Sequence, residues 1–205
     1  METTSQLFDG KGTEWVFSLG FIIIYVFSAL LFLFDNKGRF IKVKKYFALV
    51  VFLLVLLLNG WHFMLYLTSY WQQSLQLESL FIGIILGVGI CVSFAILFYF
   101  LLRYFDTFID SKTSGYFLLF FAIGQLMQSI VLLQQVDVLP MSLLVWNSTS
   151  FIAENSEFGQ LLRVLFGYET TPSLMQVIVY LTAFIVPVLI SKSRYFLRLT
   201  YGEKP

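Results

Sequence analysis

The sequence has few charged residues and only one cysteine, and each shortage excludes a class of protein. Charged residues make up 12% of the 205 residues, whereas roughly a quarter of a soluble globular domain is charged. The lone cysteine, Cys91, lies in an apolar stretch, which excludes a disulfide framework and a metal site of paired thiols. The net charge of +1 and the lack of a basic patch give no sign of nucleic-acid binding.

Long apolar runs take the place of charge, and 59% of the residues are hydrophobic. A helix needs roughly 20 apolar residues to cross a hydrocarbon core of about 30 Å. Such runs predict five transmembrane helices, at about residues 15–34, 46–67, 79–102, 116–133 and 174–190. The runs are continuous rather than alternating, which excludes barrel strands. We therefore expect an all-α polytopic helix bundle in the lipid bilayer, with residues 1–205 forming a single membrane domain.

The basic residues predict the orientation of the bundle. Eleven of the 13 lie between the first two spans, between the third and fourth, or in the C-terminal tail. This bias places the N-terminus outside and the C-terminus in the cytoplasm, which requires an odd number of spans. The first 13 residues lack the basic start of a signal peptide. We expect a multi-pass protein of the plasma (inner) membrane.

The outward connection before the last span, residues 134–173, is too long for a simple turn. It is apolar over residues 161–166, so we expect it to fold back onto the bundle. Residues 159–166 resemble a short amphipathic helix that ends at Gly167. Pro172 suits the first turn of the last span, where a missing N–H costs little.

Polar residues inside a membrane are expensive and are therefore candidates for function. Asn59 and His62 in the second span share a helix face, and Gly60 between them allows close approach of a neighbouring backbone. The imidazole of His62 could bind a metal ion, or it could form a hydrogen bond between helices. Gln125 and Gln128 in the fourth span could line a permeation path or bond to another helix. In the third span, Gly83 and Gly87 favour tight helix packing.

The outward connection also carries acids. Glu154 and Glu157 are three residues apart and could jointly capture a hard cation, although such pairs are often only solvated. The sequence contains no catalytic triad, phosphate loop, zinc motif or haem motif. We therefore expect no enzyme activity and no firmly bound cofactor.

Residues 146–180 read WNSTSFIAENSEFGQLLRVLFGYETTPSLMQVIVY. This segment resembles the C-terminal region of the high-affinity, oxidase-dependent iron permeases. That region has a Trp-Asp-Ser/Thr-Ser element, then Gly-x-Leu-Leu-x-x-Leu-x-Gly-Tyr, then Pro-Ser and the final span. The corresponding residues here are Trp146, Asn147, Ser148, Thr149, Gly159, Leu161, Leu162, Leu165, Gly167, Tyr168, Pro172 and Ser173. Asn147 stands where the family has Asp. With the order and spacing of the preceding spans included, the resemblance covers roughly residues 46–191.

The sequence departs from that family where its members bind iron. The family has seven spans, with Arg-Glu-Gly-x-Glu motifs in the first and fourth. The second of these motifs corresponds to Leu58, Asn59, Gly60, Trp61 and His62, in which only the glycine matches. The first motif has no counterpart. Ferric iron prefers carboxylate oxygen, so the loss of the acids weakens any site at this position.

The resemblance implies that the chain takes part in iron ion transport across the membrane, with iron as the transported substrate. It would do so as a homo-oligomer or beside another membrane subunit that carries the acids. An extracytoplasmic iron oxidase or iron-binding protein would be a further partner. In this interpretation Asn59, Gly60, His62, Gln125 and Gln128 line the path, and Glu154 and Glu157 capture ions outside. The alternative is a non-transporting scaffold or accessory subunit of a membrane complex.

Overall fold

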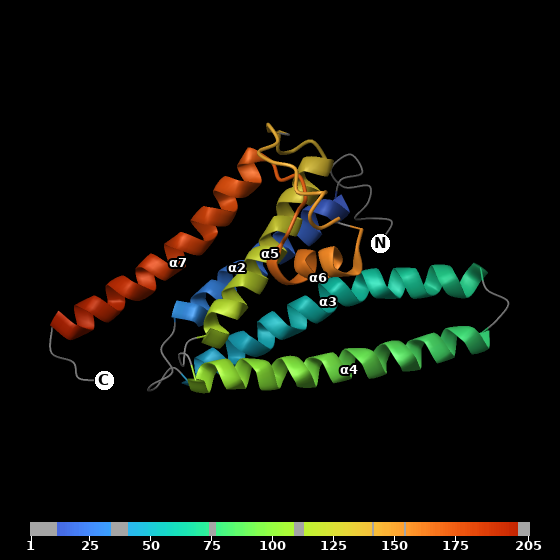
Figure 1. Ribbon diagram of the computed structural model, residues 1–205, viewed down its shortest axis with the longest axis horizontal. Helices are drawn as coiled ribbons and strands as arrows, with labels where there is room; N and C mark the ends of the chain where they lie inside the picture. The colour runs from blue at the N-terminus through green and yellow to red at the C-terminus, as the bar shows by residue number, and fades with distance from the viewer. Residues whose placement is uncertain are drawn as a thin grey trace. The chain divides into compact units, whose positions relative to one another are not determined.

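The computed structural model describes residues 12–33, 41–73, 77–108, 113–140, 142–153 and 155–200. The helices in this part of the chain are α2 (Gly12–Leu33), α3 (Ile41–Gln73), α4 (Leu77–Phe108), α5 (Thr113–Gln135), α6 (Glu157–Phe166) and α7 (Leu174–Thr200) (Figure 1). All of these except α6 are long and apolar enough to cross a membrane. The prediction of an all-α polytopic bundle with five spanning helices is confirmed.

Several helices run past the apolar segments from which they were predicted. Helix α3 continues through the lysines at its start and the glutamines at its end, and α4 and α7 also outlast their apolar runs. Each residue added to an existing helix gains a backbone hydrogen bond, and Lys, Arg and Gln are good helix formers. Apolar content therefore locates a span, but it does not fix where the helix ends.

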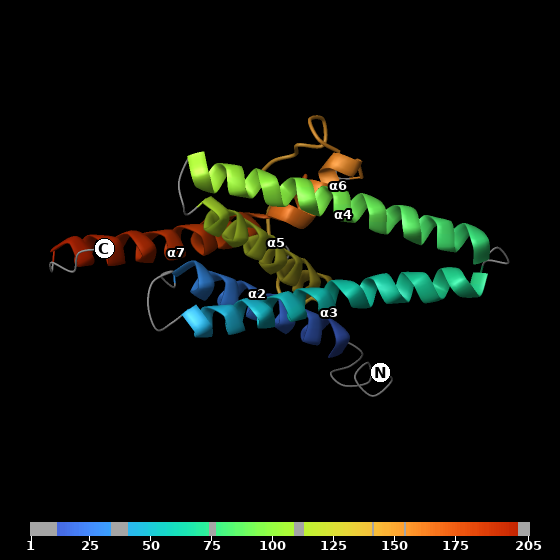
Figure 2. The ribbon, with the colours of Figure 1, turned by 90° about the horizontal axis from the view of Figure 1, so that it is seen from below.

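The chain divides into two compact units, residues 55–117 and residues 1–54 with 118–205, and each is described by itself. In the first of these, α3 and α4 run in opposite directions (Figure 2). The carboxylate of Asp106 near the end of α4 accepts the backbone N–H of Ser114 at 2.8 Å. The ring of Phe117 lies 6.1 Å from that of Phe98 and 6.4 Å from that of Phe105. These contacts fix the start of α5 against the end of α4.

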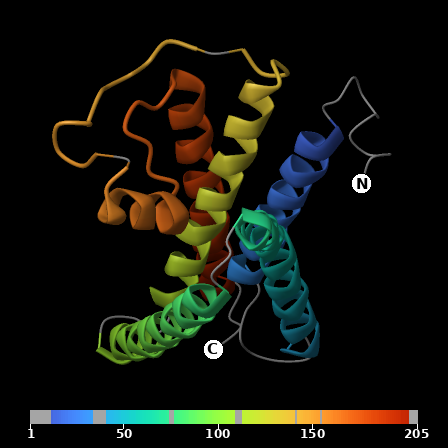
Figure 3. The same ribbon diagram turned by 90° about the vertical axis from the view of Figure 1, so that its right-hand side faces the viewer.

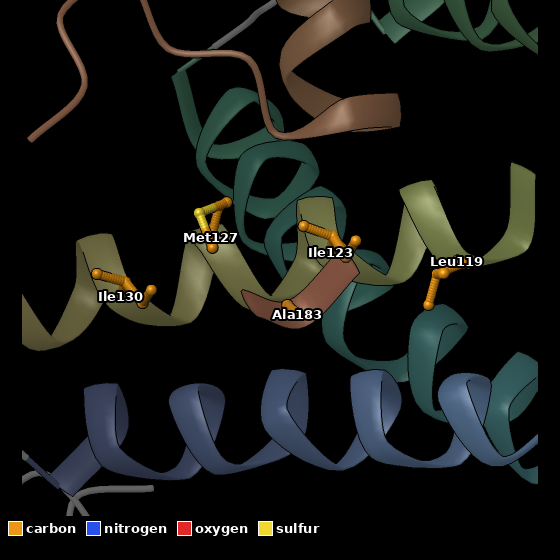
Figure 4. Close-up of a cluster of buried hydrophobic side chains, with 5 residues drawn as sticks. All are labelled: Leu119, Ile123, Met127, Ile130 and Ala183. Atoms are coloured by element: carbon orange, nitrogen blue, oxygen red, sulfur yellow. The ribbon is translucent and has the colours of Figure 1, made fainter. Parts of the chain in front are cut away.

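The other unit has its apolar core on one face of α5. Leu119, Ile123, Met127 and Ile130 recur every three or four residues, which places them along one side of the helix. All four are buried, and Ala183 of α7 joins them (Figure 4). The core therefore holds α7 against α5, and it positions both elements that border the outward connection.

A proline inside α7 explains one link between helices. Pro187 has no N–H, so the carbonyl of Ala183 four residues earlier lacks its helical donor. The hydroxyl of Tyr25 in α2 donates to that carbonyl at 2.9 Å. Within a membrane a freed carbonyl must be satisfied by a neighbour. Tyr25 thus supplies the missing hydrogen bond and ties α2 to α7.

Candidate functional site

The predicted path residues of the second span lie in α3, within the unit of residues 55–117. The side chain of Asn59 is exposed, and its amide donates to the carbonyl of Val55 in the same helix at 3.0 Å. A Cβ atom placed on Gly60 would meet nothing within 4 Å. His62 lies in the helix, but its side chain is outside the described part of the structure. Metal binding by His62 stays a prediction.

The glycines of α4 are equally open. A Cβ atom on Gly83 or Gly87 would meet nothing within 4 Å. The tight packing predicted at these two residues is therefore not made by the described residues of the unit 55–117.

The glutamines of α5 lie in the other unit. Gln125 is 1% exposed, and its Oε1 has no hydrogen-bond partner among the residues described. Gln128 is half-buried. One turn beyond Gln125, the hydroxyl of Ser129 bonds to that of Ser18 in α2 and donates to its carbonyl. Ser18 and Ser129 thus form a buried polar contact between α2 and α5. That Gln125 and Gln128 line a path together with Asn59 stays a prediction.

The acids of the outward connection are described only in part. Glu157 is the exposed first residue of α6, where a negative charge suits the helix dipole. Ser156 caps this helix, because its Oγ accepts the N–H of Gly159 at 3.0 Å. Glu154 lies outside the described residues, so its pairing with Glu157 stays a prediction. In the part of the chain that the structure describes, no three His, Cys, Asp or Glu side chains could hold a metal ion together.

A buried polar cluster forms where α5 ends and α7 begins. The oxygen of the Gln176 amide accepts the N–H of Ser173 at 2.7 Å, and its nitrogen donates to Glu169 at 2.6 Å. Gln134 of α5 donates to the hydroxyl of Ser173 at 3.4 Å. Gln134, Ser173 and Gln176 are each less than 10% exposed. The cluster therefore holds a half-buried carboxylate against the ends of two spanning helices.

Sequence reasoning missed this cluster, although one signal for it was present. Ser173 precedes the last span and Gln176 follows three residues later, which is the pattern of a capping box. In the structure Ser173 is the residue before α7, so Pro172 lies before the cap rather than in the first turn. The carbonyl of Pro172 instead accepts the N–H of Val145 at 3.0 Å.

Some of the residues that carry the iron-permease resemblance hold residues 148–152 against residues 167–170 as one element, whereas Trp146, Thr149 and Leu161 are exposed. The hydroxyl of Ser148 lies 2.8 Å from that of Tyr168 and donates to the carbonyl of Thr170 at 3.1 Å. The Tyr168 hydroxyl also donates to the carbonyl of Ile152. Gly167 ends α6 with φ +68°, a left-handed conformation that suits glycine, which confirms the predicted helix end.

This element is seated on α5 by a close contact between two glycines. A Cβ atom on Gly124 would lie 2.9 Å from the backbone nitrogen of Gly167. The ring of Phe120 meets that of Phe166 at 6.0 Å beside this contact. Figure 3 shows α6 lying crosswise to α5 and α7. Only glycine at residue 124 lets the end of α6 approach this closely.

The arrangement offers oxygen ligands without a complete metal site. Carboxylate and amide oxygens suit hard cations, but Gln176 already uses both ends of its amide within the cluster. No protein-family model, curated protein or solved structure matches the chain.

Proposed function

We propose that the chain is an iron-permease-like integral membrane protein that takes part in iron ion transport. It acts as an oligomer or beside a membrane subunit that supplies acids. The main support is the resemblance over residues 146–180, because several of its residues make contacts within the element seated on α5. Ser148 and Tyr168 are hydrogen-bonded to each other, and Gly167 makes the close contact with Gly124.

The same proposal gives the orientation and the partners. The basic connections face the cytoplasm, so the element of residues 142–173 faces outward. Outward-facing Glu157 would offer a carboxylate to an arriving cation together with Glu154. An extracytoplasmic iron oxidase or iron-binding protein would deliver iron at this face. The path beyond needs further acids, because hard cations are bound by several oxygen ligands.

A non-transporting scaffold is the second candidate, and one observation favours it. The amide of Asn59, at the position of a family glutamate, is hydrogen-bonded to its own helix backbone. A residue used in this way can support helix structure without meeting an ion. In this case the chain would keep the permease bundle for packing against a partner.

Uptake of radioactive iron into liposomes that contain only this protein separates the two candidates. Wild-type protein is compared with the Asn59→Ala, His62→Ala double variant and with Thr68→Val as a matched control on the same helix. Thr68 is exposed and its hydroxyl bonds its own helix, so this change leaves a path intact. Uptake lost only in the double variant supports transport by the chain itself. No uptake by folded wild type contradicts transport by this protein alone and favours the scaffold.

A further inference from the structure

One exposed face of helix α3 changes from cationic to apolar along its length. Lys42, Lys45 and Tyr46 share this face, because the second and third lie three and four residues after the first. Leu49 and Phe52 continue the face with the same spacing. All five side chains are exposed. The face therefore begins with two ammonium groups, passes a phenol ring and continues as an apolar surface.

The opposite side of the same helical segment packs inward. Val51 is buried, and the ring of Phe47 meets that of Phe27 in α2 edge to face at 5.2 Å. Phe47 and Val51 are four residues apart, so they lie on one side of α3. At 3.6 residues per turn, Lys45 and Leu49 lie on roughly the other side. The contact with α2 thus fixes the rotation of α3 and leaves the cationic and apolar face exposed.

The charge around the start of this face has one sign. Residues 36–46 include five Lys or Arg, and the sequence has no Asp or Glu between residues 36 and 77. A basic cluster directly beside a spanning helix attracts anionic lipids, and each Lys or Arg near the membrane surface strengthens the attraction roughly fivefold. Tyrosine rings favour the headgroup level, so Tyr46 marks the boundary between headgroups and acyl chains. The two exposed lysines therefore lie at the level of lipid phosphates.

We propose that this face of α3 binds an anionic phospholipid. The lipid phosphate lies at Lys42 and Lys45, and one acyl chain follows Leu49 and Phe52. A phospholipid has the same order of chemistry along its length, because a negative headgroup leads through a neutral polar linkage to an apolar chain. A free phosphate ion would meet only the lysines, whereas a lipid also covers the exposed apolar side chains. The occupant that fits the whole face is therefore a lipid.

Fluorescence quenching at the apolar part of the face tests this site. Cys91 is the only cysteine, so Cys91→Ser gives a background in which each added thiol is unique. A fluorophore is attached to Leu53→Cys, an exposed residue four positions after Leu49. The control is Leu181→Cys, which is exposed on α7 in a stretch, residues 164–191, that has no Lys or Arg. Both proteins are studied in phosphatidylcholine vesicles that contain a small fraction of one brominated lipid, either phosphatidylglycerol or phosphatidylcholine.

We expect brominated phosphatidylglycerol to quench the Leu53→Cys fluorophore at least about threefold more than brominated phosphatidylcholine does. The two lipids should quench the Leu181→Cys fluorophore equally. The Lys42→Gln, Lys45→Gln double variant should lose the preference, whereas Lys42→Arg, Lys45→Arg should keep it because the charge is retained. Equal quenching by both lipids at Leu53→Cys would overturn the site. An equal preference at Leu181→Cys, or a preference that survives the glutamine variant, would overturn it as well.

A soluble competitor distinguishes a lipid from a free phosphate group. Glycerol phosphate is added to the same vesicles at constant ionic strength, because salt alone screens the lysines. We expect the preference for phosphatidylglycerol at Leu53→Cys to survive, since the soluble anion lacks acyl chains. Loss of the preference would show that the lysines bind a free phosphate group, and the lipid proposal would fail. Neither readout involves iron, so this failure is distinct from a failure of iron uptake.

Discussion

The hydrogen bond between Tyr25 and the carbonyl of Ala183 gives a prediction with a built-in control. The Tyr25→Phe change keeps the ring and removes the donor, which leaves the Ala183 carbonyl without a partner because Pro187 has no N–H. An unsatisfied buried carbonyl costs about 1–3 kcal/mol. Measured bonds between membrane helices average roughly 0.6 and reach about 1.7 kcal/mol. We expect Tyr25→Phe to lower the free energy of unfolding by about 1–2 kcal/mol.

Restoring the helical donor should remove most of that cost. In a Pro187→Ala background, the N–H of residue 187 can bond to the Ala183 carbonyl, so Tyr25→Phe should cost less than about 0.5 kcal/mol. Reversible unfolding by sodium dodecyl sulfate in mixed micelles, followed by circular dichroism, measures all four proteins of this cycle. Thr182→Val is the matched control in α7, because the Thr182 hydroxyl is exposed and bonds only its own helix among described contacts. An equal cost of Tyr25→Phe in both backgrounds would show that the Tyr25 hydroxyl does not replace the missing helical donor.

The same unfolding assay checks three further predictions. Gly124→Ala should destabilise the protein by about 1–3 kcal/mol, since its Cβ would meet the Gly167 backbone at 2.9 Å. The control Gly87→Ala, which has open space around it, should change the free energy of unfolding by less than about 0.5 kcal/mol. Similar costs for the two variants would contradict the close contact between α6 and α5. Gly167→Ala should cost about 1–2 kcal/mol because alanine is strained at φ +68°, and a neutral result would exclude that conformation. Ser129→Ala should cost roughly 1 kcal/mol, and adding Ser18→Ala should cost much less than a second independent change; strict additivity would show that the two hydroxyls do not interact.

The spans could be predicted from the sequence, and the contacts between them could not. Each span is a local run of apolar residues whose length the bilayer fixes. The contact between Gly124 and Gly167 joins residues 43 positions apart, and nothing in either local sequence names its partner. A lone glycine within an apolar span was the available hint.

Two further features were readable in principle from local chemistry. Pro187 inside a span implies an unsatisfied carbonyl at residue 183 and a donor from elsewhere, but the pattern cannot identify Tyr25. The pair Ser173 and Gln176 is a local capping signal that leads directly to the polar cluster. Its link to Glu169 depends on how residues 167–173 return along the bundle. The path of residues 167–173 depends on contacts with distant parts of the chain, which a local sequence pattern does not show.

The sequence predicted which helices carry the candidate site residues, but it did not predict the hydrogen bonds of their side chains. The buried state of Gln125 agrees with a polar residue that faces other helices, but periodicity could not show that its Oε1 lacks a partner. The apolar run correctly predicted one helix that includes Asn59, Gly60 and His62. It could not show that the Asn59 amide bonds back to Val55. Side-chain rotamers of exposed polar residues are set by local competition that a sequence pattern does not record.

The proposed role in iron transport is tested most directly by iron uptake in cells that normally make this protein. Radioactive iron uptake at limiting iron is compared in unaltered cells, in cells that lack the gene, and in cells that regain wild-type protein or the Gly124→Ala variant. We expect uptake to fall without the gene, to return with the wild type and to return less with Gly124→Ala, which disturbs the contact between α6 and α5. Unchanged uptake in cells that lack the protein, with no second iron system active, would contradict a role in iron transport.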